Sequence, residues 1–386
     1  MNNPPKETIS HLLNHSDHPS HKLYVIGITG TNGKTTVAHL LGEVLKAAGY
    51  KPFVLGTLNS GNKDLSTPES LDILKFMKDH LDQGGTHFVM EVTSEGIDQE
   101  RIKHVDFDVK ILTNITRDHL DYHKTFKRYE AVKLSFMREG EAHKIYPENF
   151  TDTSVDFTTQ LVGDFNLLNI KTAVTALRYI GISEKYISGT LSSCRPPKGR
   201  LESVEAGQQF MVLIDYAHTP DALQNALLTV KKIAEDRKGR LLLLFGCGGN
   251  RDSGKRSQMG RIAGEISDFF VITDDNPRLE ESQSIMDGIV KGIASDFHEY
   301  VLIQDRKKAI EFIVNKSEDN DVVILAGKGH ETYQVLKTET IYFDDQEEVE
   351  KAILQRLTKE YHLQQPALCS IELRHDNLSD LIGHVH

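Results

Sequence analysis

The chain has 386 residues, of which 39% are hydrophobic and 26% are charged. This is the balance of a globular protein with a large core divided into two or three domains. The 45 Lys and Arg and 56 Asp and Glu residues give a net charge of −11, which argues against nucleic acid or an anionic membrane surface as a general partner. The opening MNNPPKETISHLL has no basic and apolar leader, no later apolar run is long enough to span a membrane, and the three cysteines have no metal-binding spacing. We therefore expect a cytoplasmic protein.

The first half of the chain alternates between apolar runs and helical patterns. Residues 1–21 are polar with scattered prolines and are expected to form an irregular lead-in. The elements expected after it are a strand ending in a glycine-rich turn at 23–33, a helix at 36–48, a strand at 52–55, a helix at 68–83, and strands at 86–92 and 109–113. This order predicts an α/β domain over residues 22–194, with a mostly parallel sheet and ligand residues at the carboxyl ends of the strands.

A second unit follows the stretch RPPKGR at 195–200, whose prolines and glycine are typical of a domain junction. Beyond it, apolar runs again alternate with helical patterns, at 210–215, 240–247, 268–273, 300–303 and 321–326. The pattern predicts a second, Rossmann-like doubly wound domain over residues 195–360. From residue 361 to 386 the alternation is lost, and we expect a tail with a helical pattern only near 378–382.

The glycine-rich turn after the first strand has the composition of a phosphate-binding loop. Its glycines let backbone N–H groups turn toward a polyphosphate, Lys34 can bridge the terminal phosphates, and Thr35 can offer its hydroxyl to Mg²⁺. The spacing departs from the general G-x-x-x-x-G-K pattern, because Ile28 stands at the first glycine position. We still predict a nucleotide triphosphate site, made by Gly30, Thr31, Asn32, Gly33, Lys34, Thr35 and Thr36.

Two stretches that follow later strands of the same sheet carry metal-binding side chains. Glu91 ends one strand, and the sequence RDHLDYH at 117–123 follows another. Carboxylates and imidazoles suit Mg²⁺ beside nucleotide phosphates. The alternative, which holds for such residues when they stand alone, is that they are ordinary surface residues without a function. The neighbouring phosphate loop favours the metal site. Lys133 lies in a helical stretch, and by residue type alone we expect it to be solvated.

The second unit has three polar turns after strands, CGGNRDSGKR at 247–256, TDDNPR at 273–278 and AGKGHE at 326–331. They bring Arg278, Lys328, His330 and Glu331 to one sheet edge. Charges of both signs suit a zwitterionic ligand such as an amino acid, whereas the alternative is polar turns capped by Asp and Asn.

Together these motifs resemble the Mur ligases, ATP-dependent peptide-bond-forming enzymes of cell-wall precursor synthesis. The likeness is greatest to the type that adds the third amino acid to UDP-N-acetylmuramoyl-dipeptide, and it runs from about residue 18 to residue 357. The motifs stand in the family's order, as TGTNGKTT, STPES, MEVTSEG, TNITRDHLDYH, YEAVKLSF, GDFNLLN, GRLE, DYAHTPDAL, FGCGGNRDSGKR, TDDNPR and GKGHETYQ.

The resemblance implies a role for the residues around the phosphate loop. Lys34 and Thr35 would hold the ATP phosphates and one Mg²⁺, while Glu91 and His119 look like metal ligands. Lys133 matches a lysine that CO₂ converts to a carbamate, which helps to hold a second Mg²⁺; this replaces the expectation of a solvated side chain. The catalytic residues implied are Lys34, His119, Lys133 and Arg200.

The resemblance also implies contacts to the nucleotide and to the incoming amino acid. Asn166 and Asn169 look like adenine-side residues, Asp215 matches a ribose-binding aspartate, and Arg200 matches an arginine that reaches the γ-phosphate. The incoming amino acid, diaminopimelate-like by the DNPR and GKGHE motifs, would bind at Arg251, Asn276, Arg278, Gly327 and Glu331.

The acceptor side departs from the family. Only about twenty residues precede the phosphate loop, so we expect no N-terminal UDP-binding domain, and Glu95 stands where the third-residue ligases have a histidine. Acceptor-side positions are Thr67, Ser94 and Glu95. We therefore expect an amide ligase with an acyl-phosphate mechanism and a changed carboxylate acceptor. The alternatives are a precursor ligase that uses a UDP-binding partner chain, or a non-catalytic nucleotide-binding regulator; the oligomeric state stays open.

Overall fold

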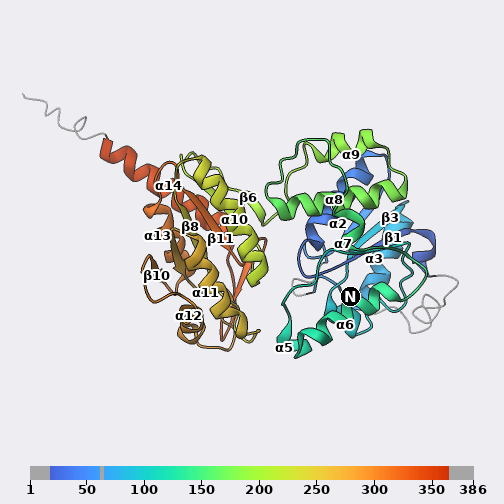
Figure 1. Cartoon of the computed structure of the whole chain (residues 1–386), viewed down its shortest axis with the longest axis horizontal. Coiled ribbons are helices and arrows are strands. Elements are labelled where there is room, and N and C mark those ends of the chain that lie inside the picture. The colour runs from blue at the N-terminus through green and yellow to red at the C-terminus, as the bar shows by residue number, and fades with distance from the viewer. Residues whose placement is uncertain (1–17, 61–64, 365–386) are drawn as a thin grey trace, which may run out of the picture.

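The computed structural model describes residues 18–60 and 65–364. Two sheets, each covered by helices on both faces, stand side by side (Figure 1). The first sheet has the order β2-β3-β1-β4-β5, and all its strands are parallel. Its strands are β1 (Tyr24–Thr29), β2 (Pro52–Leu55), β3 (His87–Glu91), β4 (Val109–Leu112) and β5 (His143–Ile145).

Apolar side chains on both faces of the first sheet explain its helical layers. In β1, Ile26 and Ile28 pack into one core while Val25 packs into the other, because successive side chains of a strand point to opposite faces. One face is covered by α2 (Lys34–Ala47), α7 (Pro147–Phe150), α8 (Asp164–Ile180) and α9 (Glu184–Leu191). The other is covered by α3 (Ser70–Asp82) and α6 (Phe126–Arg138); the short elements are η1 (Pro19–Lys22), α4 (Ser94–Asp98) and α5 (Leu120–His123).

The second sheet has the order β10-β9-β8-β11-β7-β6, and only β6 is antiparallel to its neighbour. Its strands are β6 (Arg200–Ser203), β7 (Met211–Asp215), β8 (Leu241–Phe245), β9 (Phe269–Ile272), β10 (Tyr300–Leu302) and β11 (Val322–Ala326). One face carries α10 (Pro220–Asp236), α11 (Gly254–Ile266) and α12 (Ser282–Val290), and the other carries α13 (Arg306–Lys316) and α14 (Asp345–Gln364). A hairpin of β12 (Tyr333–Val335) and β13 (Thr340–Tyr342) follows β11.

The expected α/β class, with two mostly parallel sheets, is confirmed. The short strands β5, β6, β12 and β13 were not expected, and α14 continues to Gln364, past the boundary placed at 360. The helical pattern at 378–382 and most of the expected lead-in lie outside the described residues. Within the part of the chain that the structure describes, no helix is long and apolar enough to cross a bilayer.

Candidate active site

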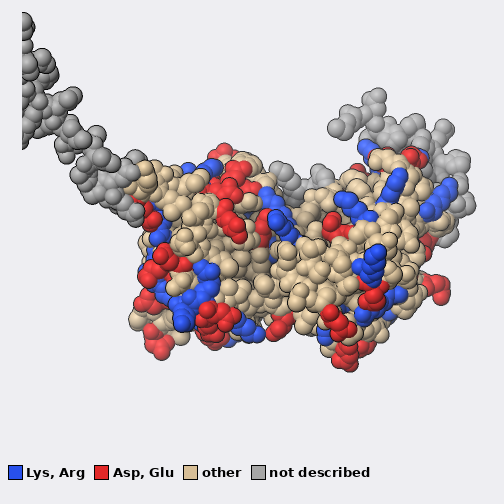
Figure 2. Space-filling model, turned by 90° about the horizontal axis from the view of Figure 1, so that it is seen from above, with Lys and Arg blue, Asp and Glu red and all other residues tan. Residues whose placement is uncertain are grey.

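A cavity of about 470 Å³ lies between the two halves of the molecule, at the carboxyl ends of both sheets. The phosphate loop, Glu91 and His119 line it from the first half, and Arg200, Arg251 and Glu331 line it from the second. On the face seen in Figure 2, positive and negative side chains are interspersed over both halves. The polar groups are concentrated in one cavity. This arrangement fits the binding of a small charged ligand better than the binding of an extended charged partner.

The phosphate loop is shaped by glycine. Gly33 has φ of 88°, a backbone conformation that favours glycine. A Cβ built there would lie 2.3 Å from Asn169 Oδ1, so any larger residue would collide with the Asn169 side chain. Gly33 is also the N-cap residue of α2, and no side chain of the described residues caps the helix. The first N–H groups of α2 are therefore available to an anion. Lys34 Nζ folds back and donates to the carbonyl oxygens of Gly30 and Thr31, at 2.9 Å each.

Glu91 forms a cluster of hard oxygen atoms beside the phosphate loop. Its Oε2 accepts hydrogen bonds from Thr35 Oγ1 at 3.1 Å and from Thr57 Oγ1 at 3.0 Å, and its Oε1 accepts one from Thr57 N at 2.9 Å. The Glu91 side chain is buried at the end of β3. A carboxylate and a hydroxyl that meet at a phosphate loop fit the oxygen ligands that Mg²⁺ prefers.

Lys133 is buried in α6, so the expectation of a solvated side chain is wrong for this lysine. Its Nζ donates to Gly30 O at 2.8 Å and lies 4.9 Å from the centre of the Tyr129 ring. Burial, reinforced by the charge of Lys34, holds the pKa of Lys133 well below its ordinary value. A neutral amine is the form that reacts with CO₂, so this environment fits the expected carbamate.

His119 lies between two carboxylates. Its Nδ1 is 2.6 Å from Glu95 Oε1, and its Nε2 is 3.3 Å from Asp118 Oδ2. Burial lowers the pKa of His119, but Asp118 and Glu95 outweigh it and raise the pKa above the ordinary value. Burial likewise opposes the charge of Glu95, yet the hydrogen bond from His119 lowers the pKa of Glu95 to about 2. The two groups therefore stabilise each other's charged forms.

The expected metal ligands do not meet at one point. Thr35 contacts Glu91, whereas His119 contacts Glu95 and Asp118. No group of three His, Cys, Asp or Glu side chains able to hold a metal ion is present in residues 18–60 and 65–364. Any Mg²⁺ held here would take part of its coordination from nucleotide phosphate oxygens or water, as Mg²⁺ commonly does.

Arg200 connects the second half of the molecule to the phosphate loop. It begins β6, its Nη2 donates to Thr35 Oγ1 at 3.2 Å, and its guanidinium lies 4.7 Å from the centre of the Tyr216 ring. Its buried Nε has no hydrogen-bond partner among the described residues. Asp215, which pairs with Arg200 across the two strands, accepts hydrogen bonds from Leu201 N and Ala217 N at 2.8 Å each.

The two expected adenine-side asparagines differ in exposure to the cavity. Asn169 lines it, together with Phe165 of the same helix. Asn166 lies behind and supports its neighbour: Asn169 Nδ2 donates to Asn166 Oδ1 at 3.2 Å, and Asn166 Nδ2 donates to Val162 O at 2.9 Å.

On the amino-acid side, a buried lysine joins two of the expected residues. Lys328 Nζ is fully buried and contacts Glu331 Oε2 at 3.1 Å and Asn276 Oδ1 at 3.4 Å, while Asn276 Nδ2 donates to Glu331 Oε2 at 2.9 Å. Burial and then Asp275 raise the pKa of Glu331, although Lys328 opposes them. Sequence reasoning placed Lys328 at this edge, but not in direct contact with the expected substrate residues.

Three other expected residues surround this group. Arg278 has φ of 55°, and its Nη1 donates to Gly249 O at 3.1 Å. Gly327 has φ of 111°, and a Cβ there would lie 2.6 Å from Asp275 Oδ2. Arg251 is half exposed and lies 3.8 Å from Asp121 Oδ2 across the cavity.

The expected acceptor residues have unequal access to the cavity. Glu95 lines it, and Ser94 Oγ donates to Glu95 Oε2 at 3.1 Å. Thr67 is fully buried and acts on the backbone, donating to Glu91 O at 3.0 Å and accepting from Thr93 N at 2.9 Å. Thr67 therefore braces the turn after β3 and does not line the cavity. Arg101 does line it, but its guanidinium contacts Thr67 O, Gln99 and Glu69.

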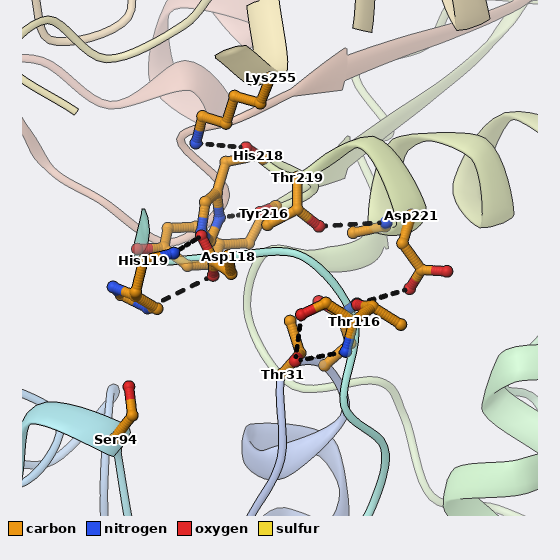
Figure 3. Close-up of polar contacts among 12 residues, drawn as sticks. Thr31, Ser94, Thr116, Asp118, His119, Tyr216, His218, Thr219, Asp221 and Lys255 are labelled. Atoms are coloured by element: carbon orange, nitrogen blue, oxygen red, sulfur yellow. Dashed lines mark hydrogen bonds and ion pairs between the residues drawn. The ribbon is translucent and has the colours of Figure 1, made fainter. Parts of the chain in front are cut away.

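Polar contacts join the two halves of the molecule beside the cavity (Figure 3). Asn32 Nδ2 of the phosphate loop donates to Asp221 Oδ2 of α10 at 2.7 Å. His218 Nε2 lies 3.8 Å from Asp118 Oδ2, and Lys255 Nζ donates to His218 O at 2.7 Å. Sequence reasoning missed the two contacts between the halves, because Asn32 and Asp221 are 189 positions apart and His218 and Asp118 are also far apart, so they share no periodicity.

Comparisons with known proteins agree with this two-part site. Residues 28–155 match the Mur ligase middle domain, and residues 199–329 match the Mur ligase, glutamate ligase domain. A UDP-N-acetylmuramoyl-L-alanyl-D-glutamate–2,6-diaminopimelate ligase from Bacillus cereus is 35% identical over 399 residues, covering 89% of this chain and 80% of the relative. The chain belongs to the Mur ligase family. It is therefore an ATP-dependent ligase that joins a carboxylate to an amine.

Further relatives and solved structures agree with the family assignment. The ligase of the same name from Clostridium tetani is 37% identical and covers 88% of this chain and 79% of the relative. A solved structure of a UDP-N-acetylmuramoyl-L-alanyl-D-glutamate–2,6-diaminopimelate ligase is 28% identical, with a TM-score of 0.53 over 87% of this chain and 79% of that one. MurF ligase from Thermotoga maritima in complex with ADP has a TM-score of 0.65 at 16% identity over 93% of this chain and 84% of that one, a likeness of fold.

Proposed function

We propose that this Mur ligase joins the amino group of a diaminopimelate-like amino acid to a carboxylate acceptor through an acyl phosphate, with conversion of ATP to ADP and phosphate. One observation carries the proposal. Arg200 of the second half reaches the phosphate-loop hydroxyl of Thr35 at 3.2 Å, and the residues proposed for the nucleotide and for the amino acid line the same cavity, which supports the proposal. Dependence on ATP and the free thiols Cys194 and Cys247 support a cytoplasmic location.

The proposed reaction uses charged side chains from both halves of the cavity. A carboxylate oxygen of the acceptor attacks the γ-phosphorus of ATP, and the bond from that phosphorus to the bridging oxygen breaks to release ADP. The amino group then attacks the acyl carbon, the amine loses a proton, and phosphate leaves. Lys34 and Arg200 stabilise the negative charge that is spread over the transferring group, and the contacts between the halves align the three substrates.

The residues present fit the magnesium ions and the carbamate that the family resemblance implies. Thr35 and Glu91, which are hydrogen-bonded to each other, would hold one Mg²⁺, and His119 together with carbamylated Lys133 would hold a second. When bound, Mg²⁺ supplies positive charge that offsets the charge of the phosphates. Carbamate formation needs only attack of the neutral Lys133 amine on CO₂ and loss of one proton, and the buried, low-pKa environment of Lys133 supports it.

The amino-acid wall suits a ligand with charges of both signs. Arg251 and Arg278 are cations available to carboxylates, while Glu331, supported by Asn276 and Lys328, offers an anionic oxygen to an ammonium group. A diamino dicarboxylic acid has two carboxylates and two ammonium groups, so it could pair with more of these charged side chains than a simple amino acid could. This supports a diaminopimelate-like donor.

The acceptor wall supports a changed acceptor. Glu95 remains anionic beside the reaction centre, although its contact with His119 relieves the repulsion expected from the sequence. Arg101, the cation that lines this wall, is already engaged by three protein groups. Among the described residues, this wall therefore offers little free positive charge, which favours an acceptor with one reacting carboxylate over one with several anionic groups.

A second candidate acceptor is UDP-N-acetylmuramoyl-L-alanyl-D-glutamate itself, because the relatives at 35% and 37% identity are named for it. The test is phosphate release from ATP and Mg²⁺ with meso-diaminopimelate and a panel of acceptors, with product masses measured. The panel runs from UDP-N-acetylmuramoyl-dipeptide to short peptides and single amino acids. Turnover with a small acceptor supports the changed-acceptor proposal, whereas robust turnover with the UDP-linked dipeptide alone refutes it. A lack of turnover with every acceptor would contradict the ligase assignment for the isolated chain.

A further inference from the structure

Glu95 occupies an unusual position relative to His119. The imidazole lies between two carboxylates on opposite edges of the ring, with Nδ1 at 2.6 Å from Glu95 and Nε2 at 3.3 Å from Asp118. His119 itself has φ of 51°, a left-handed backbone conformation that turns the side chain out of the loop at the start of α5. The ring therefore depends on its neighbours for its orientation.

Glu95 is in turn held firmly. Ser94 Oγ donates to its second oxygen at 3.1 Å, and the residue lies in the first turn of α4, which Thr93 caps through a hydrogen bond from Gly96 N. A carboxylate fixed at a helix N-terminus keeps its negative charge and its direction. Glu95 can therefore set the position of His119 rather than follow it.

We propose that Glu95 is a positioning residue that fixes His119 as a metal ligand. Because Glu95 accepts the Nδ1 hydrogen, a metal would bind at Nε2, which lies 3.3 Å from Asp118 Oδ2, so Asp118 would move aside or bind the same ion. Histidine ligands commonly donate their other ring N–H to a carboxylate, which fixes the tautomer and the ring orientation, and loss of that partner typically weakens metal binding 10- to 100-fold. This inference rests on the proposed role of His119 and adds to it a function for Glu95.

The inference also explains the departure from the family at this position. A histidine in place of Glu95 could not supply the negative charge that Glu95 gives to the Nδ1 side of His119. In this account Glu95 acts on the metal site through His119. Its negative charge near the acceptor follows from its pairing with His119.

The test is a double-mutant cycle with Mn²⁺ as the probe. The dissociation constant of Mn²⁺ is measured by electron paramagnetic resonance with a non-hydrolysable ATP analogue, on the whole chain and on Glu95→Ala, His119→Ala and the double variant. We expect Glu95→Ala to weaken Mn²⁺ binding about 10- to 100-fold in the wild-type background and less than about 2-fold when His119 is already alanine. Glu148→Gln, which removes an exposed charge from α7, is the matched control and leaves the constant unchanged.

Each contrary outcome has a distinct meaning. An equal effect of Glu95→Ala in both backgrounds would overturn the inference, since Glu95 would then act without His119. Glu95→Gln keeps an acceptor oxygen for Nδ1–H but removes the charge, so it should lose less affinity than the alanine variant; a loss as large as that of the alanine variant, with an unchanged circular dichroism melt, would also overturn the inference. If His119→Ala leaves Mn²⁺ binding unchanged, the proposed metal role of His119 itself fails.

Discussion

Replacement of Arg200 by alanine tests the contact that joins the two halves of the cavity. The variant loses a hydrogen bond to Thr35 Oγ1 at 3.2 Å and a guanidinium contact 4.7 Å from the Tyr216 ring. Each is worth about 1 kcal/mol to the fold, so the free energy of unfolding should fall by no more than about 2 kcal/mol. In the proposed reaction the same guanidinium would contact the transferring phosphoryl group, and the loss of such a group costs about 10²- to 10³-fold in kcat, or about 2.7–4 kcal/mol.

The assay measures ADP release at saturating substrates, together with a thermal melt of the same sample. Arg261→Ala is the control, because Arg261 pairs with Glu265 on the exposed side of α11 and has no contact with the cavity. We expect the control to keep full kcat and Arg200→Ala to lose at least about 100-fold while it melts near the wild type. A folded Arg200→Ala enzyme within about threefold of wild-type kcat would refute the reasoning, since catalysis would then not require the charge that crosses the cavity.

Three further substitutions test separate parts of the site. Lys133→Ala should lose at least about 100-fold in kcat, and intact-protein mass spectrometry in bicarbonate should find one added CO₂ in the wild type but not in the variant. Arg278→Ala should raise the KM for the amino acid about 10- to 100-fold, the value of one charged hydrogen bond, and an unchanged KM would exclude a carboxylate contact. Burial, and then the charge of Arg200, lower the pKa of His330 to about 3, below its unfolded value near 6.5. The unfolded chain therefore binds one more proton between these values, and stability falls with falling pH. His330→Gln should reduce the slope of unfolding free energy against pH by up to about 1.4 kcal/mol per unit from pH 6 to 4; equal slopes in chemical denaturation would contradict this.

The strands that could be predicted are those buried on both faces. In β8, Leu241 and Leu243 pack into one core while Leu242 and Leu244 pack into the other, so the strand is a continuous apolar run in the sequence. The edge strand β5 (His143–Ile145) and the hairpin strands β12 and β13 have three residues each and mix polar and apolar side chains. Strands this short show too few residues for an alternation of polar and apolar side chains to be recognised. Whether such a strand forms depends on its pairing with a neighbouring strand.

The site could be predicted in part. Glycines, Lys34 and Thr35 stand next to one another in the chain, so a single stretch of sequence predicts the phosphate loop. Lys133 could not be predicted from its residue type, because its burial depends on the packing of α6 against the loop at Gly30. The contact of Glu95 with His119 was also missed, since it joins the turns after two different strands.

The most direct test of the central claim follows the oxygen atoms. An acceptor that turns over in the panel is labelled with ¹⁸O in its carboxylate, and the phosphate released from ATP is analysed by mass spectrometry. Attack of the carboxylate on the γ-phosphorus predicts that one labelled oxygen is transferred to the phosphate for each amide bond formed. Unlabelled phosphate, or release of pyrophosphate in its place, would contradict an acyl-phosphate ligase in this cavity.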